Sequence, residues 1–148
     1  MKYYVAYGSN LNLEQMAYRC PDATIVGKGI LDGYALKYRG SKTGAYATVI
    51  KEEGKYVPVV VWKISPADEQ RLDVYEGFPT FYYKKRLTVH MDSGKRMYAM
   101  AYIMFDAAKP GAPSNYYMRT LYEGYIANRL NLKILFDSFD ENDEEVAK

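Results

Sequence analysis

Cysteine and histidine are nearly absent from this 148-residue chain, which contains one of each, Cys20 and His90. A single cysteine excludes an internal disulfide and a zinc cluster built from cysteines. Chains without disulfides are typical of reducing compartments, so a cytoplasmic location is expected. Cys20, next to a proline, is interpreted as a small packed residue. His90 lies in a predicted strand and is interpreted as a surface or half-buried residue rather than a base.

Long apolar runs and nucleotide-binding motifs are missing as well. No run approaches the roughly 20 residues that cross a membrane, and the N-terminus lacks the long apolar region of a secretory signal. No G-x-x-x-x-G-K-[ST] loop is present, and Gly27, Gly29 and Gly33 do not have the spacing of a dinucleotide-binding motif. No carboxylates have the spacing of a metal site. With these kinds of site excluded, acid–base chemistry by a carboxylate is the catalysis that the sequence still allows.

The composition is that of one globular domain, with 49% apolar and 26% charged residues. The last twelve residues hold six of the eighteen acidic residues and one of the twenty basic ones, so residues 1–136 carry a net charge of +7. We expect a domain over 1–136 and an acidic, frayed tail over 137–148. A basic body favours anionic partners, including nucleic acid and small carboxylates, although solubility alone also explains it.

Strands outnumber helices in the predicted order of elements. Strands are expected over 2–7, over 23–39 with breaks at three glycines, over 45–50 and 56–64 joined by 52–55, and as a hairpin of 82–90 with 95–105. Helices are expected over 13–19 after the N-cap Asn12, from Ser65 to about Glu76, and for about 16 residues after Ser114. Gly124, within the last helix, is best tolerated where another backbone or a ligand lies close. The class is α+β with a mixed sheet that could close into a barrel.

Two places suit carboxylate chemistry on a small molecule. The segment 7–11 joins a strand to a helix, and its small residues let backbone N–H groups approach an anion, although an ordinary turn has the same composition. Glu76 stands at the C-terminal end of a predicted helix among aromatic residues. The helix dipole and apolar neighbours both raise the pKa of such a carboxyl group, whereas a solvent-exposed helix-end glutamate is the plainer interpretation.

These two segments resemble the γ-glutamylcyclotransferase-like superfamily. Its opening signature is matched by Tyr7, Gly8, Ser9, Asn10 and Leu11, and its second signature by the run from Leu72 to Pro79 followed by Tyr82. The strands between, and Ser114, Tyr117 and Gly124 of the last helix, match in the same order over about residues 3–130.

The resemblance implies a fold, a reaction and a set of site residues. The fold is a small mixed β-barrel with flanking helices. The reaction is attack of the substrate's own α-amine on the δ-carbonyl of a γ-glutamyl amide, which releases 5-oxoproline and an amine or amino acid without metal or cofactor. Glu76 is the implied general acid/base, residues 7–11 the substrate-binding loop, and Tyr82 and Tyr117 the implied pocket tyrosines, with Tyr83 as a rival to Tyr82.

Other interpretations stay open at this point. The same pocket could bind a small carboxylate without turning it over. Nucleic-acid binding is disfavoured, because the basic run 84–86 lies on a strand whose side chains alternate between faces. The leaving group is open among an amino acid, γ-glutamyl-ε-lysine, a small amine and a biosynthetic intermediate. The expected partners are a small γ-glutamyl molecule and, at most, a second copy of the chain, as monomer or homodimer, with no nucleic acid and no membrane.

Overall fold

A closed five-stranded barrel forms the centre of the computed structural model, which describes residues 1–148. Its strands are β1 (Lys2–Ala6), β2 (Thr24–Arg39), β3 (Tyr46–Ile64), β4 (Tyr82–Met91) and β5 (Arg96–Met104), arranged around the barrel in the order β1-β3-β2-β4-β5. All pairings are antiparallel except that of β1 with β5, which closes the barrel at Tyr4 and Met100. The expected mixed barrel of the α+β class is confirmed.

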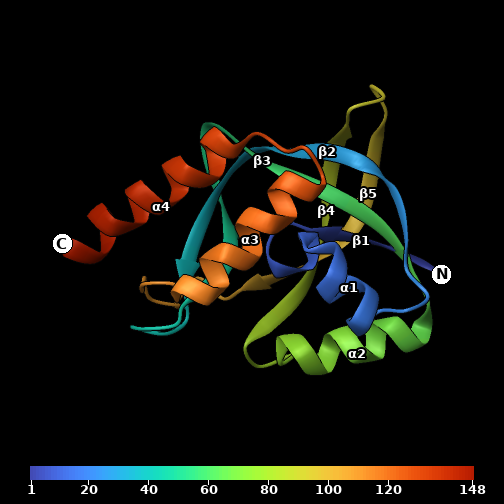
Figure 1. Ribbon diagram of the computed structural model, residues 1–148, viewed down its shortest axis with the longest axis horizontal. Helices are drawn as coiled ribbons and strands as arrows, with labels where there is room; N and C mark the ends of the chain where they lie inside the picture. Colours follow the sequence, from blue (N-terminus) through green and yellow to red (C-terminus); the bar gives the residue numbers. More distant parts are fainter.

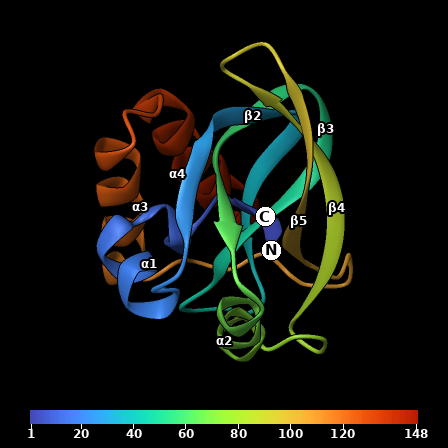
Figure 2. The ribbon, with the colours of Figure 1, turned by 90° about the vertical axis from the view of Figure 1, so that its right-hand side faces the viewer.

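Helices cover one side and one end of this barrel (Figures 1 and 2). They are α1 (Leu13–Arg19), α2 (Pro66–Glu76), α3 (Asn115–Ala127) and α4 (Leu132–Ala147), with a short 3₁₀ turn, η1, over Ser9–Leu11. Helix α2 lies across one end, and the β4–β5 hairpin projects from the opposite end (Figure 2). None of the helices is both long and apolar enough to span a membrane.

Local capping residues determine where the first two helices begin. Asn12 accepts a hydrogen bond from the Gln15 backbone N–H and caps α1, as expected. At α2, the Ser65 side chain accepts from the Asp68 N–H while the Asp68 carboxylate accepts from the Ser65 N–H, which completes a capping box. Gly77 ends α2 in the left-handed conformation at φ 65°. The end of α2 at Glu76 is therefore determined by its own sequence.

The strands β2 and β3 are continuous where interruptions were expected. The glycines do not break β2; register shifts occur between Ile25 and Gly27 and between Asp32 and Tyr34, but the strand continues. The predicted loop 52–55 is likewise part of one continuous strand, β3, in which these residues bulge out of the ladder with β2. Such long strands pass around a small barrel by bulging rather than by ending.

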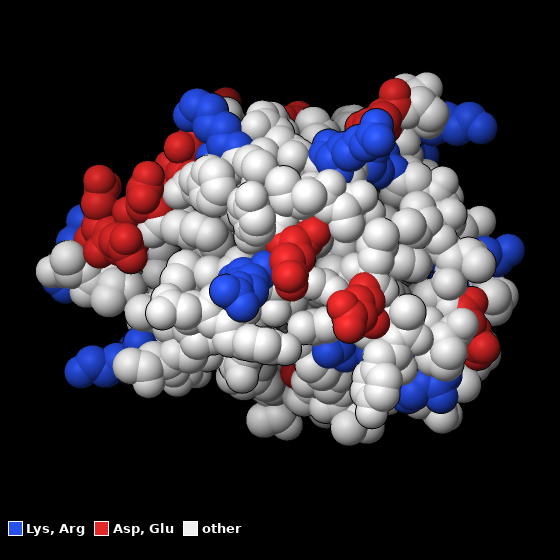
Figure 3. All heavy atoms as spheres, viewed as in Figure 1, with Lys and Arg blue, Asp and Glu red and all other residues white.

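The acidic C-terminal segment is helical rather than frayed, so this expectation is wrong. Three residues of α4, Leu135, Ser138 and Asn142, recur at helical spacing and are buried. Ser138 hydrogen-bonds the Tyr38 hydroxyl at 2.8 Å, and Asn142 donates to the Gly111 carbonyl at 2.9 Å. The acidic side chains gather over the outer C-terminal part of α4 (Figure 3). Because two of these three buried residues are polar, the composition of the segment does not reveal its buried face.

Gly124 lies where α3 touches the start of α1, which confirms that another backbone approaches it. A Cβ added there would lie 2.8 Å from the carbonyl carbon of Leu11 and 2.9 Å from the nitrogen of Asn12. Gly124→Ala is therefore expected to lower the free energy of unfolding by about 1–3 kcal/mol, although alanine is the better helix former. Urea unfolding measures this change.

Gly27→Ala is the matched control for that variant. The Cβ added at Gly27 meets only the flexible end of Met91, at 3.1 Å. We expect little change in stability there. Equal stability of both variants would contradict the close packing of α3 on the loop before α1.

Candidate active site

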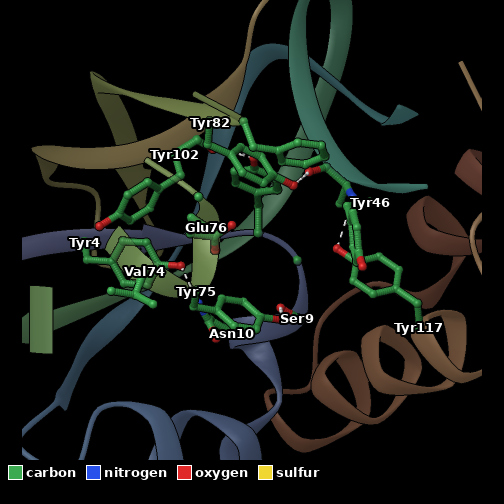
Figure 4. Close-up of a pocket in the computed structure, with 15 residues that line it drawn as sticks. Tyr4, Ser9, Asn10, Tyr46, Val74, Tyr75, Glu76, Tyr82, Tyr102 and Tyr117 are labelled. Carbon is green, nitrogen blue, oxygen red and sulfur yellow. Dashed lines mark hydrogen bonds between the residues drawn. The ribbon is translucent and has the colours of Figure 1, made fainter. Parts of the chain in front are cut away.

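A cavity of about 310 Å³ opens between the end of α2, the loop after β1 and the first turns of α3. Seven tyrosines line it, and Glu76 is its only charged residue. The lining residues are Tyr4, Tyr7, Gly8, Ser9, Asn10, Tyr46, Ala47, Val74, Tyr75, Glu76, Gly77, Phe81, Tyr82, Tyr102 and Tyr117. Figure 4 shows Glu76 at the centre, with Ser9 and Asn10 on one side and Tyr82 and Tyr117 on others.

Glu76 has the electrostatic setting of a proton-transfer group. Burial raises the pKa of its carboxyl group from 4.5 to about 7, while the nearby Arg19 guanidinium opposes this rise. The carboxyl group still faces the cavity, so a bound molecule can reach it. A carboxyl group with a pKa near neutrality accepts and returns a proton readily.

The loop after β1 forms the opposite wall. Gly8, Ser9 and Asn10 line the cavity, and the Ser9 hydroxyl hydrogen-bonds the Tyr75 hydroxyl at 3.0 Å. A Cβ on Gly8 would lie 3.2 Å from the Tyr117 hydroxyl and 3.3 Å from the Ala47 Cβ, so only glycine leaves this part of the cavity open. The loop therefore brings backbone close to whatever occupies the cavity.

Leu11 does not line the cavity, in contrast to the other four residues of the predicted loop. It is fully buried, and its carbonyl accepts a hydrogen bond from Asn128 Nδ2 at 2.8 Å. This hydrogen bond joins the loop to the end of α3, so in the structure Leu11 packs the loop against the helix and does not border the cavity.

Two tyrosines named from the sequence meet at one residue of β3. The Tyr82 hydroxyl donates to the Ala47 carbonyl at 2.7 Å, and the Tyr117 hydroxyl accepts from the Ala47 N–H at 3.0 Å. The rival Tyr83 lies outside the cavity, with its ring 4.9 Å from that of Phe105. Alternation along β4 explains this difference, because neighbouring strand residues face opposite sides.

Several cavity residues were not identified from the sequence, among them Tyr4, Tyr46, Tyr75 and Tyr102. With seventeen tyrosines in the chain, residue type alone does not single these out. Arg19 was missed too; it lies just outside the lining, 3.4 Å over the Tyr75 ring and hydrogen-bonded to Asn10. Its place in the last turn of α1, directly after the loop, was the one available signal.

Neither of the usual nucleophiles is poised for attack. Cys20 is buried away from the cavity, as expected, and burial raises the pKa of its thiol to about 11. Ser9 is the cavity's only serine, and its partner is the Tyr75 hydroxyl rather than a base. His90 is exposed on β4. The site thus provides a general acid/base without an adjacent nucleophile.

The fold and the cavity together define a class: a small closed barrel with a tyrosine-lined pocket built around one carboxyl group. The chain matches the family model described as gamma-glutamyl cyclotransferase, AIG2-like, over residues 4–121. It is 30% identical to the gamma-glutamylcyclotransferase of Bos taurus over 150 residues, covering 95% of this chain and 79% of that protein. The corresponding Homo sapiens protein is 30% identical over 138 residues, covering 88% and 73%.

A solved structure of a gamma-glutamyl cyclotransferase superposes with a TM-score of 0.84 at 27% identity, over 93% of this chain and 85% of that one. The chain therefore belongs to the gamma-glutamylcyclotransferase family, as its two sequence signatures implied.

Proposed function

We propose that this protein is a cyclotransferase acting on a γ-glutamyl amide, with Glu76 as general acid/base. The observation that carries the proposal is the placement of a carboxyl group with a pKa of about 7 in a small cavity opposite the Gly8–Asn10 loop. The names of the relatives support the same activity. We assign the activity to residues 1–136.

The reaction follows from the groups present. The substrate's α-amine attacks its own δ-carbonyl carbon, a C–N bond forms, and the carbonyl π electrons move to oxygen. When the carbonyl re-forms, the bond to the leaving nitrogen breaks. The α-ammonium loses two protons in becoming the lactam N–H, and the leaving amine gains two in becoming an ammonium; Glu76 carries protons between these nitrogens. The products are 5-oxoproline and an amine or amino acid.

The enzyme's contribution is proximity together with proton transfer. A γ-glutamyl chain must curl for its amine to meet its carbonyl, and a cavity of about 310 Å³ walled by tyrosine rings favours such a compact conformer. The absence of a poised nucleophile is compatible with this scheme, because the attacking group belongs to the substrate. A metal or cofactor has no step to perform in it.

Release of 5-oxoproline from a panel of γ-glutamyl compounds tests the proposal. The panel contains γ-glutamyl amino acids, γ-glutamyl-ε-lysine and γ-glutamyl derivatives of small amines. Stoichiometric release of 5-oxoproline and amine from at least one compound is expected. Binding of 5-oxoproline without release from any compound would instead support a binding module on the same fold.

The pH dependence follows from the ionisation of Glu76. The carboxylate must be ionised to accept a proton, and its pKa is about 7, so kcat/KM is expected to rise with pH through that value and then level. The charged and titratable groups around Glu76 are Arg19 of α1, Tyr4 and Tyr7 of β1, Tyr82 of β4 and Tyr117 of α3. A kcat/KM that is already constant above pH 5 would contradict Glu76 as the titrating base.

The partners and location belong to the same proposal. We propose a cytoplasmic enzyme, monomer or homodimer, that does not bind nucleic acid. Lys84 of the basic run is already paired with Glu69 and Asp73, each at 2.9 Å, so it is not free for a phosphate backbone. Turnover that stays constant as the salt concentration is raised would support a function without nucleic acid, because binding to a phosphate backbone weakens steeply with ionic strength.

A further inference from the structure

Three of the seven tyrosine hydroxyl groups around the cavity have already donated their hydrogen to the protein. Tyr7 donates to the Tyr102 carbonyl at 2.5 Å, and Tyr82 to the Ala47 carbonyl at 2.7 Å. Tyr102 donates to Asp73 at 2.6 Å, and its hydroxyl points away from the cavity (Figure 4). These three hydrogen bonds are made within the protein, so the three hydroxyls have no hydrogen left to donate to a ligand in the cavity.

Two other hydroxyls, those of Tyr117 and Tyr4, are acceptors. Tyr117 accepts from the Ala47 backbone N–H, whereas Tyr4 is the one linked through a side chain to a charged group. The Asn10 side-chain Nδ2 donates to the Tyr4 hydroxyl oxygen at 2.8 Å, and no acceptor in the protein takes the Tyr4 hydrogen. The residue Tyr4 is 4% exposed, and its hydroxyl lies beside Glu76 (Figure 4). Burial raises the pKa of Tyr4 well above its ordinary value, so the hydroxyl stays protonated. It is a donor without a partner, directed into the cavity.

The positive charge of Arg19 is connected to the Tyr4 hydroxyl through the Asn10 side chain. The Arg19 guanidinium donates to the Oδ1 of Asn10, and it is held in place by the Tyr75 ring, whose centroid is 3.4 Å away. Hydrogen bonds in a chain polarise one another. Arg19 therefore strengthens the Asn10 amide as a donor, and the amide in turn strengthens the Tyr4 hydroxyl.

We propose that Tyr4 is a further catalytic residue, whose hydroxyl, polarised by Arg19 through Asn10, donates to the δ-carbonyl oxygen of the γ-glutamyl substrate as negative charge develops there. This proposal rests on the proposed function. Glu76 carries protons between the attacking and the leaving nitrogens, and both of these nitrogens are bound to the δ-carbon during the reaction. The carbonyl oxygen is the remaining hetero atom on that carbon, so it also lies near Glu76, where the Tyr4 hydroxyl is found.

Tyr4→Phe tests the donor directly, since it removes one hydroxyl and keeps the buried ring. Loss of one donor to a developing oxyanion is expected to lower kcat about 100-fold, with KM changed less than about threefold. Tyr83→Phe is the matched control, because that ring lies outside the cavity and its loss of a hydroxyl is expected to leave kcat unchanged. A Tyr4→Phe enzyme with wild-type kcat, or with a raised KM alone, would overturn the proposal.

Asn10→Asp provides a second test that keeps the tyrosine. An aspartate at this position accepts from both Arg19 and the Tyr4 hydroxyl. Tyr4 then donates its hydrogen to this carboxylate and no longer to the substrate. We expect a loss of kcat similar to that of Tyr4→Phe on the high-pH plateau, and little additional loss in the double variant. Full kcat in Asn10→Asp, or losses that multiply in the double variant, would contradict the relay.

Wild-type enzyme on the same substrates separates the two proposals. A wild-type protein that releases no 5-oxoproline from any compound counts against the proposed function. An active wild type with an equally active Tyr4→Phe variant overturns the role of Tyr4 alone.

Discussion

Glu76→Gln is expected to abolish measurable turnover, with a fall in kcat of about 10³-fold or more. The glutamine keeps the shape of the side chain but neither accepts nor returns a proton, and general acid–base catalysis contributes about 10²–10⁴-fold. Glu76 is also the only charged residue of the cavity lining, so no neighbouring carboxylate can replace it. Release of 5-oxoproline from the best substrate of the panel measures the loss.

The same variant is expected to fold well, and above pH 7 to be more stable than the wild type. Folding raises the pKa of Glu76 from 4.5 to about 7, so ionisation of this carboxyl favours the unfolded chain. The stability that the protonated group contributes is complete below pH 4.5 and is lost as the pH rises through about 7. The full difference corresponds to about 3 kcal/mol, and contact of the carboxyl with the open cavity reduces it to about 1–2 kcal/mol.

Thermal unfolding at pH 5 and pH 8 separates this effect from simple damage. Glu76→Gln and wild type are expected to differ little at pH 5, with the variant the more stable at pH 8. An inactive variant that is less stable at both pH values points to lost structure instead. A folded variant with near-wild-type turnover removes Glu76 from the mechanism.

Gly8→Val is expected to lower kcat/KM at least about 100-fold by closing the cavity. The first added carbon would already lie 3.2 Å from the Tyr117 hydroxyl and 3.3 Å from the Ala47 Cβ, and the two further methyl groups of valine extend beyond it. Tyr117 is tied to the Ala47 N–H at 3.0 Å, so it yields only by breaking that bond. Misplacement of a bound substrate by about 1 Å costs on the order of 10²-fold in rate.

A graded series makes this prediction specific. Gly8→Ala adds only the first carbon, and its effect on 5-oxoproline affinity and on kcat/KM is expected to lie between those of glycine and valine. Circular dichroism checks that both variants keep the barrel. Unaltered affinity in a folded Gly8→Val protein means that the loop does not border the binding site.

The helices and the hairpin that follow from short-range hydrogen bonds could be predicted from the sequence. The capping box at Ser65 and Asp68 and the left-handed Gly77 lie within twelve residues of one another, and they determine that α2 ends at Glu76. Asn12 caps α1 through a residue three positions away. Such bonds depend on neighbours along the chain, and their residue types are therefore visible in the sequence.

Elements whose limits depend on distant partners were misjudged. The continuity of β2 and β3 depends on their mutual pairing around the barrel, where bulges take up the glycines and residues 52–55. Helix α4 is held by Tyr38 and Gly111, which are 100 and 31 residues distant from their partners. Neither partner can be identified from local composition.

The sequence by itself determined that Glu76 ends a helix, that a glycine-containing loop follows the first strand, and which family the signatures resemble. The tertiary structure decided which tyrosines face the cavity, because bonds such as Tyr7 to Tyr102 and Ala47 to Tyr117 join residues 95 and 70 positions apart. It also decided the proton affinity of Glu76. Burial depends on every element that surrounds the carboxyl group, and long-range packing alone brings those elements together.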